Sequence, residues 1–443
     1  MSTLAPKAAH LALVALLAAC GGRDTAEPQD VYGSGWSAVH ADAGNADYSP
    51  LPGAADLQPV WSRSFTGRCV PHLPFCINLG PTSDAQGQTY VVLNALSGCV
   101  LFALDSATGD TIWCSDEVDR FASISSPLID REGHLYLADS EAMHAFDRDG
   151  SLLWESPIVG VPLSAHFTPG GNLIFITHIG HVHVLRRNDG SPVMPAVVLA
   201  PGLQYESGEN VLSCATGRPQ CPSANTPAID LTSGRFIFTW WEPGAPQSGV
   251  RAMQLTEGAS PLLTPLWSNE SMSGGSASSP TLSADGSRVY VTDNGRELHA
   301  LDAATGETIW RFDIGYAAAG SPSVSPHGLI MPAGGGALSG GGRVLAVQDR
   351  GDHAALAWRQ GGWINGGIST QAAGNIAYVT DLQLAALPYL VVVDTETGSE
   401  LDRELLPGLQ GFTVGTTVGH DGSVYVPSVL GELFAFRPAE TSP

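Results

Sequence analysis

Short runs of hydrophobic residues recur along the chain, and polar turn residues separate them. One such run, Val289-Tyr290-Val291, follows the turn signal Asp285-Gly286. Apolar runs of this length, rich in β-branched and aromatic residues and bounded by Gly, Asp and Pro, predict β-strands rather than helices. Matching runs recur at intervals of about forty to sixty residues. They begin at Tyr90, Leu135, Leu173, Phe236, Val289, Leu329, Ala377 and Val424.

A longer motif repeats within this pattern. Residues 103–113 read ALDSATGDTIW, and residues 300–310 read ALDAATGETIW. Each copy predicts a hairpin, because Asp accepts hydrogen bonds from turn amides, Gly takes the positive φ of the turn, and Trp follows on the next strand. Weaker copies contain Asp147 with Trp154, and Asp394 without a Trp. The predicted turn aspartates are Asp105, Asp147, Asp302 and Asp394.

Four short strands make up one repeat, which is the size of one propeller blade. The repeats predict an all-β fold, a single eight-bladed β-propeller of four-stranded antiparallel blades. The last repeat ends after residues 433–436 without an outer strand that bears Trp, and residues 59–65 around Trp61 supply such a strand. We therefore expect this N-terminal strand to close the ring and cover the sheet edges. Two domains are the alternative, but no charged or low-complexity linker interrupts the repeats.

The first residues have the features of an export signal. Lys7 and His10 precede the apolar run Leu11 to Ala19, which is too short to span a bilayer as a helix. The run ends in Leu17-Ala18-Ala19-Cys20, which resembles the lipobox of bacterial lipoproteins, in which the Cys is lipidated. An ordinary secretory signal with an incidental Cys is the alternative.

The residues after Cys20 are polar and lack periodicity, which is typical of a tether. Gly21 stands where an Asp would indicate retention in the inner membrane of a Gram-negative cell, so we expect the outer membrane, with the propeller facing the periplasm or the cell exterior. The predicted organisation is a lipoprotein signal peptide at 1–19, a lipid-anchored flexible tether at 20–33, the propeller at 34–437 and a C-terminal tail at 438–443.

Apart from Cys20, six of the seven cysteines form three pairs that are close in sequence, as suits an exported protein. Cys99 and Cys114 flank the hairpin turn of the first full repeat, so a cross-strand disulfide is expected there. Metal binding is the competing interpretation, but the spacings are not those of CxxC knuckles. The expected disulfides are Cys69–Cys76, Cys99–Cys114 and Cys214–Cys221.

Charge excludes some partners. The chain carries 43 Asp and Glu against 20 Lys and Arg, which gives a formal net charge of −23. This balance argues against binding to nucleic acid or to anionic lipid surfaces, so contact with a membrane is expected through the N-terminal lipid only. It favours solubility and a basic partner surface, although a compositional bias of the source genome explains it equally well.

The motif Ala-x-Asp-x-x-Thr-Gly-x-x-x-Trp resembles the tryptophan-docking repeat of PQQ-type propellers, and the resemblance covers residues 34–437. In that family the indole of one blade stacks against the Ala and Gly of its neighbour. Residues 36–51 also resemble the N-terminal segment of quinoprotein dehydrogenases and their relatives. By this resemblance the docking residues are Trp61, Trp113, Trp154, Trp267, Trp310 and Trp358, with Gly109 and Gly306.

Two branches of that family compete. Quinoprotein alcohol and glucose dehydrogenases hold PQQ and Ca²⁺ above a disulfide between adjacent cysteines, and this chain has no adjacent pair. The other branch is lipid-anchored and cofactor-free, and its best-known member is BamB, the propeller subunit of the outer-membrane β-barrel assembly machinery. The lipobox, size and blade count resemble this second branch.

Other candidate sites are few. His178, His181 and His183 lie close enough in sequence to suggest a transition-metal site, but polar strand faces at a propeller rim explain them as well. Trp240-Trp241 suits either an exposed protein contact or a buried structural role. No Gly-x-Ser-x-Gly or His-Glu-x-x-His motif is present, so we assign no catalytic residues, no metal and no cofactor.

These features predict a non-enzymatic, monomeric, lipid-anchored propeller that binds envelope protein partners through its rim loops. A periplasmic dehydrogenase of an alcohol or sugar that depends on PQQ and Ca²⁺ is the alternative.

Overall fold

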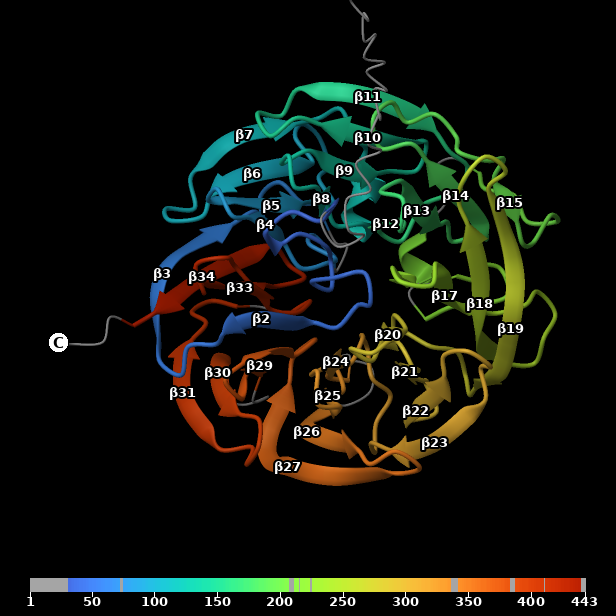
Figure 1. The fold of residues 1–443 in the computed structure, drawn as a ribbon. Coiled ribbons are helices and arrows are strands. Elements are labelled where there is room, and N and C mark those ends of the chain that lie inside the picture. The colour runs from blue at the N-terminus through green and yellow to red at the C-terminus, as the bar shows by residue number, and fades with distance from the viewer. Residues whose placement is uncertain are drawn as a thin grey trace, which may run out of the picture.

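The computed structural model describes residues 31–71, 75–206, 211–214, 216–223, 225–335, 342–382, 387–409 and 411–439. The strands in these ranges form a ring of radial sheets around a central axis (Figure 1). Two short 3-10 helices, η2 (Arg120–Ile124) and η3 (Val211–Cys214), lie in connections between sheets. Within the described ranges no helix has the length and apolar character needed to cross a membrane.

The described strands group into eight four-stranded units, which we number as blades 1 to 8 in chain order, consistent with the predicted eight blades. Blade 1 contains β4 (Thr82–Asp84), β5 (Gln88–Val92), β6 (Leu101–Asp105) and β7 (Thr111–Ser115). Blade 2 contains β8 (Leu128–Ile129), β9 (Leu135–Ala138), β10 (Ala142–Phe146) and β11 (Leu152–Pro157). Blade 3 contains β12 (His166–Phe167), β13 (Leu173–Ile176), β14 (His181–Leu185) and β15 (Val197–Val198). Blade 4 contains β16 (Ala228–Asp230), β17 (Arg235–Trp240), β18 (Ser248–Thr256) and β19 (Leu262–Met272).

The second half of the ring has the same plan. Blade 5 contains β20 (Thr281–Leu282), β21 (Arg288–Thr292), β22 (Glu297–Asp302) and β23 (Thr308–Asp313). Blade 6 contains β24 (Ser323–Val324), β25 (Leu329–Met331), β26 (Gly342–Asp349) and β27 (Ala354–Asn365). Blade 7 contains β28 (Thr370–Ala373), β29 (Ile376–Asp381), β30 (Tyr389–Asp394) and β31 (Glu400–Leu405). Blade 8 contains β32 (Thr417–Val418), β33 (Val424–Pro427), β34 (Glu432–Pro438) and, from the N-terminal part of the chain, β3 (Leu57–Ser64).

The predicted closing strand is confirmed. β3 pairs antiparallel with β34, and Trp61 lies opposite Ala435. Blades 6 and 7 also share a continuous sheet, because Asn365 at the end of β27 pairs with Asp381 of β29. The two remaining short strands, β1 (Gly35–Trp36) and β2 (Tyr48–Pro52), add to the axial edges of blades 1 and 7.

Burial follows each strand's distance from the axis. Every residue of β9 and β10 is buried, whereas Leu152 and Leu153 of the outer strand β11 are exposed. The middle strands are covered by neighbouring blades on both faces, so they consist of nearly continuous apolar residues. This explains why the sequence shows apolar runs there rather than strict alternation.

The antiparallel order gives the ring two different faces. The connections between strands 1 and 2 and between strands 3 and 4 of each blade lie on one side, which we call the turn face. The connections between strands 2 and 3 and between successive blades lie on the opposite side, the loop face. Most turn-face connections are short, although residues 186–196 between β14 and β15 are an exception, whereas the loop face carries the long connections between blades 8 and 1 and between blades 3 and 4.

Outer-strand tryptophans join one blade to the next. The indole N–H of Trp61 in blade 8 donates to the carbonyl of Ser106 in blade 1 (3.0 Å), and its ring packs on Gly109. Four more tryptophans dock in the same way on a glycine of the next blade: Trp113 on Gly150, Trp154 on Gly190, Trp267 on Gly306 and Trp358 on Gly398. Trp310 differs, because its N–H donates to the Asp349 carboxylate of blade 6 (3.2 Å).

Gly109→Ala should weaken the junction between blades 8 and 1. A Cβ at residue 109 would lie 2.6 Å from the Trp61 ring, and φ there is +75°. Gly98 is the matched control, because its φ is +74° and an added Cβ meets nothing within 4 Å. In urea unfolding we expect Gly98→Ala to cost about 1 kcal/mol through backbone strain, and Gly109→Ala to cost about 2–3 kcal/mol more through the clash. Equal losses would contradict the docking role.

Candidate functional site

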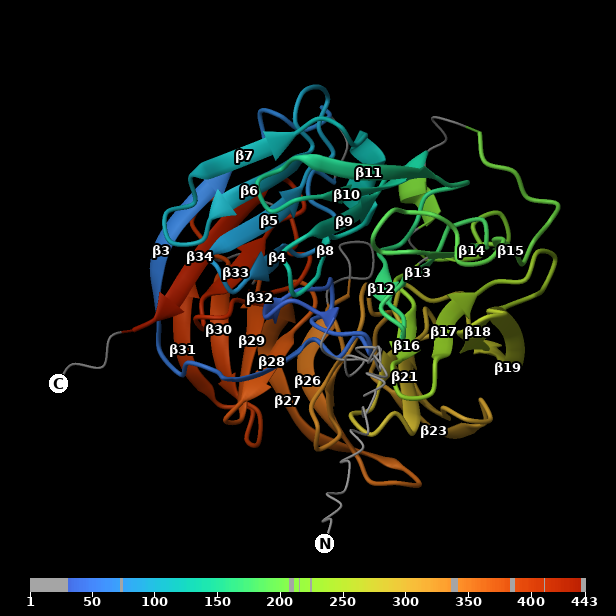
Figure 2. The ribbon, with the colours of Figure 1, turned by 45° about the horizontal axis from the view of Figure 1, so that its top comes forward.

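Residues 31–54, which we call the channel segment, occupy the centre of the ring (Figures 1 and 2). This segment, which includes β1 and β2, pairs with the innermost strands of blades 1, 2, 4, 5, 6 and 7. Carbonyls of Ser37, Ala43, Gly44, Ala46 and Asp47 accept hydrogen bonds of 2.8–3.0 Å from the backbone N–H groups of Ile129, Ile229, Leu282, Val324 and Gln371. The segment therefore covers strand edges that would otherwise line an open channel.

The channel segment begins earlier than the sequence predicted. Residues 31–33 were expected in the tether, yet Arg131 donates its backbone N–H to the Val31 carbonyl (3.0 Å), and Gly33 donates to Ile129 (2.9 Å). The apolar Val31 side chain is buried. The boundary was wrong because pairing with a strand edge depends on backbone groups, and no side-chain pattern reports it. At the other end, β34 extends to Pro438, one residue beyond the predicted limit.

Alternate residues of the channel segment point into the ring. Ala43, Asn45, Asp47 and Ser49 are buried, although the stretch is a succession of turns in which Asn45 and Asp47 have positive φ values of 61° and 45°. Asp42 lies in the same stretch but remains exposed to solvent, and its Oδ1 accepts the N–H groups of Gly44 and Ala46. Although the side chain is exposed, nearby protein atoms exclude part of the water around its carboxylate, and this desolvation raises the Asp42 pKa to about 6.

Asn45 is fixed by a fully partnered polar network. Its side-chain NH₂ donates to three carbonyls of blades 4 and 5, those of Thr226, Pro227 and Pro280. This orientation leaves the Asn45 Oδ1 to accept from His166 Nε2 (3.1 Å), while His166 Nδ1 accepts from the Tyr32 hydroxyl (3.1 Å). Burial lowers the His166 pKa to about 3, so the ring is neutral and acts as a structural link.

His40 connects a carboxylate to two hydroxyls. Its Nδ1 lies 2.8 Å from Asp47 Oδ2, and its Nε2 lies 3.2 Å from Ser279 Oγ and 3.4 Å from Ser321 Oγ. This connectivity resembles a hydrolytic triad. Ser279 is only 2% exposed and His40 3%, so a substrate has no access to the hydroxyl. The arrangement instead fixes the channel segment to blades 5 and 6.

A small cavity lies beside this pair. Its volume is about 10 Å³, which is enough for one water molecule. Of its lining residues, Thr416 has a buried hydroxyl without a hydrogen-bond partner. The lining residues are Val39, His40, Asp47, Leu79, Gly80, Ile368, Val414, Gly415, Thr416 and Thr417, with no Arg or Lys among them.

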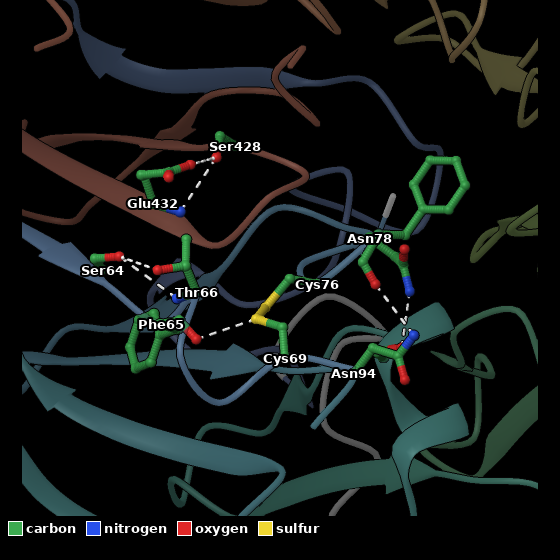
Figure 3. Close-up of a disulfide and its surroundings, with 11 residues drawn as sticks. Ser64, Phe65, Thr66, Cys69, Cys76, Asn78, Asn94, Ser428 and Glu432 are labelled. Carbon is green, nitrogen blue, oxygen red and sulfur yellow. Dashed lines mark hydrogen bonds between the residues drawn. A yellow bond between two sulfur atoms is a disulfide. The ribbon is translucent and has the colours of Figure 1, made fainter. Parts of the chain in front are cut away.

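The three predicted cysteine pairs are disulfides in the structure. Cys69–Cys76 lies where the closing strand passes from blade 8 to blade 1, packed against Gly431 (Figure 3). The N–H of Cys76 donates to the Val429 carbonyl of blade 8 (2.6 Å), and the N–H of Asn94 in blade 1 donates to the Cys76 carbonyl (2.7 Å). This disulfide therefore stiffens a loop that holds both sides of the closure.

The other two disulfides also belong to the loop face. Cys99 precedes β6, and its bond to Cys114 joins two neighbouring parts of blade 1. Cys214–Cys221 lies in the long connection between blades 3 and 4, where both sulfurs are buried against Phe121 and Val161. Each disulfide restrains a connection rather than a blade core.

The structure does not bring His178, His181 and His183 together as metal ligands. Among the described residues, the two groups of donor atoms close enough to share an ion are Asp130, Glu132 and His134, and Asp293, Glu297 and His299. Val161 donates its N–H to His178 Nδ1 (3.0 Å), so the neutral His178 ring carries its proton on Nε2. A protonated nitrogen is not a metal ligand, which argues against a site at His178.

Trp240 and Trp241 have different environments in the structure. Trp240 is fully buried and packs on Gly180 of blade 3, and its indole N–H donates to Glu242 (3.0 Å). Trp241 is half-buried. The buried role therefore applies to Trp240, at a junction where β15 has no docking tryptophan.

The turn aspartates hold the hairpins as expected from their position. Asp105 Oδ1 accepts the N–H groups of Ala107 and Thr108 (2.9 Å each), and Asp302 and Asp394 make equivalent bonds. Asp147 accepts from Arg148.

Sequence reasoning missed a tyrosine that recurs in the second strand of several blades. Each ring lies behind a docking tryptophan at a centroid distance of 6.0–6.1 Å, in the pairs Tyr90–Trp113, Tyr136–Trp154, Tyr290–Trp310 and Tyr425–Trp61. The recurring Val-Tyr-Val strands carried this signal. An aspartate follows three residues after Tyr136, Tyr290 and Tyr378. These aspartates, Asp139, Asp293 and Asp381, each accept a backbone N–H from the preceding blade or from the connection that follows it.

Buried neutral histidines make stability depend on pH. Burial lowers the His183 pKa to about 4 from 6.5, so the unfolded chain binds a proton between these values and the folded chain does not. Stability from this group is complete above pH 6.5 and is lost as pH falls. His183 stacks on Phe175 at 5.1 Å, and His183→Phe keeps a ring without a titrating group.

When the pH falls from 7.5 to 5, we expect the unfolding free energy of the wild type to decrease by about 1–2 kcal/mol more than that of His183→Phe. Urea titrations at both pH values measure this difference. Parallel pH profiles would show that His183 is not buried neutral.

Cys20 lies outside the described residues, as do residues 440–443 of the predicted tail.

Comparisons with known proteins agree with this fold. A family model described as outer membrane protein assembly factor BamB matches residues 54–211 and 250–442. Protein Rv3035 of Mycobacterium tuberculosis is 31% identical over 412 residues, which cover 91% of this chain and 96% of that protein.

Two solved structures are similar in fold. BamB from Moraxella catarrhalis has a TM-score of 0.57 at 15% identity and covers 86% of this chain and 99% of its own. Quinohemoprotein alcohol dehydrogenase from Comamonas testosteroni has a TM-score of 0.60 at 15% identity and covers 92% of this chain and 82% of its own. The predicted resemblance is confirmed, and the chain belongs to the PQQ-like propeller family described as outer membrane protein assembly factor BamB.

Proposed function

We propose that this protein is a non-enzymatic, lipid-anchored propeller of the bacterial cell envelope that binds protein partners through its loop face. The observation that carries this proposal is the channel segment. It lies along the axis of the ring, and the cavity beside its His40 and Asp47 has a volume of only about 10 Å³. Its backbone and side chains are already paired with the blades.

The loop face supports a binding role. Three large apolar side chains are strongly exposed there, Leu96 (63%), Leu387 (58%) and Val159 (48%). Rigid strands hold the connections that carry them, and disulfides restrain others beside them. Exposed apolar groups on stiff loops lose little conformational entropy on binding, which favours contact with another protein.

The family name supports an envelope location, since BamB is described as an outer membrane protein assembly factor. The short apolar run before Cys20 supports export with a lipid on that cysteine.

The fold similarity to quinohemoprotein alcohol dehydrogenase keeps a PQQ- and Ca²⁺-dependent dehydrogenase as the second candidate. PQQ is a tricarboxylate, so its site needs cations or a metal with several amide donors. The residues around the axial cavity do not fit it, because they contribute the Asp47 carboxylate and no Arg or Lys, and the cavity holds about 10 Å³. Neither acidic group that has the geometry for an ion borders this cavity.

We expect the purified protein neither to bind PQQ at micromolar concentration in the presence of Ca²⁺ nor to reduce a dye with an alcohol or sugar. Fluorescence titration with PQQ measures binding, and dye reduction measures turnover. Saturable binding with Ca²⁺-dependent turnover would contradict the scaffold proposal and favour the dehydrogenase.

Affinity capture from detergent-solubilised envelopes tests the binding role. We expect the wild type to capture a defined partner, and Leu96→Glu with Val159→Glu to reduce its recovery at least about fivefold, because charges replace apolar contacts. Leu262→Glu is the matched control, since Leu262 is 54% exposed on the outer strand β19 and away from the loop face. An equal loss in both variants, or no partner in the wild type, would contradict the proposal.

A further inference from the structure

The described chain begins on the turn face, close to the axis. The Val31 carbonyl accepts the N–H of Arg131, and Tyr32 forms a bridge with Asp130 in the first turn of blade 2. The Val31 side chain also contacts Gly171 in the first turn of blade 3. These turns belong to the turn face, so Val31, the first described residue, lies on that face.

From this point the channel segment rises toward the loop face and returns. At its far point His40 and Asp47 border the cavity formed with Gly80 and Thr416, which precede the innermost strands. On its return Gly53 donates to the Ala373 carbonyl (2.8 Å) at the end of β28. Because hydrogen bonds hold both limbs, the position at which the chain leaves the ring is fixed.

We infer that the N-terminal anchor holds the turn face toward the membrane and presents the loop face to the aqueous compartment. This inference rests on the proposed lipidation of Cys20. The partner class that follows is a water-soluble protein domain that approaches from the side away from the bilayer.

The length of the linker supports this orientation. Ten residues lie between Cys20 and Val31, and the eleven Cα–Cα steps that join them span at most about 40 Å when fully extended. If the loop face lay against the membrane, the linker would have to run outward from the axis across the four strands of a blade and the side chains beyond them, about 20 Å, and then along the height of the blade and its loops, about 30 Å. This path is longer than the linker can reach. The loop face is therefore out of reach of the lipid headgroups.

Charge limits how closely this face approaches lipid. The turns nearest the bilayer carry exposed acidic side chains, which an anionic leaflet would repel, so we expect the turn face to stand off the surface rather than to lie flat on it. These residues include Asp110, Asp149, Asp189, Asp285, Glu307 and Asp352.

Energy transfer to the membrane tests the orientation. The lipidated full-length protein is reconstituted in vesicles of phosphatidylcholine and phosphatidylglycerol (7:3) that contain a headgroup acceptor dye. A fluorescent amino acid is placed at position 352 on the turn face or at position 96 on the loop face, both of which are exposed. We expect transfer from position 352 to be at least about twofold more efficient, because the two positions differ in height by about 30 Å.

Two controls separate the possible failures. Inserting twenty Gly and Ser residues after Gly22 should bring the two efficiencies close together, because a long flexible linker frees the orientation. Cys20→Ser should abolish vesicle binding. If the wild type carries no fatty acid and does not bind vesicles, the proposed anchoring is wrong. If it binds vesicles and positions 96 and 352 transfer equally, or position 96 transfers more, the orientation alone is wrong.

Discussion

The contact between an outer-strand indole and a turn glycine of the next blade is the interaction on which the ring depends. The glycine supplies a positive φ for the turn and leaves space for the ring, and the indole N–H is satisfied by a carbonyl of the same turn. A tyrosine of the second strand packs behind the indole. Each of these contacts contributes about 1 kcal/mol beyond the free energy of the apolar area that it buries. Because the ring is closed, the contacts act together.

Two junctions depart from this indole–glycine contact. Between blades 3 and 4, Trp240 packs backwards on Gly180, and Glu257 accepts hydrogen bonds from Thr168, Gly170 and Asn172. Between blades 5 and 6 Trp310 binds Asp349, the last residue of β26, whose carboxylate also binds Tyr290 and Arg288. Glu257 and Asp349 keep these links at the turn face, whereas Trp240 and Gly180 meet at the loop face.

The channel segment makes the axis structural. It joins six blades through backbone hydrogen bonds, and its buried side chains Asn45 and His40 are paired with groups from blades distant in sequence, while Asp47 pairs with His40. Function is therefore expected at the periphery, where the two faces differ. Short acidic turns form one face, while long connections with three disulfides and exposed apolar residues form the other.

The repeats were sufficient to predict the four-stranded blades and the closing strand around Trp61, and the cysteine pairs close in sequence predicted the three disulfides, because these are contacts between residues with a local pattern or a fixed spacing. Trp61 and Gly109 could be recognised for the same reason. The Asn45–His166 and His40–Ser279 contacts could not, because they join positions about 120 and 240 residues apart. The channel segment pairs mainly through backbone groups, which every residue carries, so the family resemblance of residues 36–51 did not show where the segment lies. Only the closed ring brings these edges to one axis, and only the tertiary structure shows that the segment fills it and on which face the chain emerges.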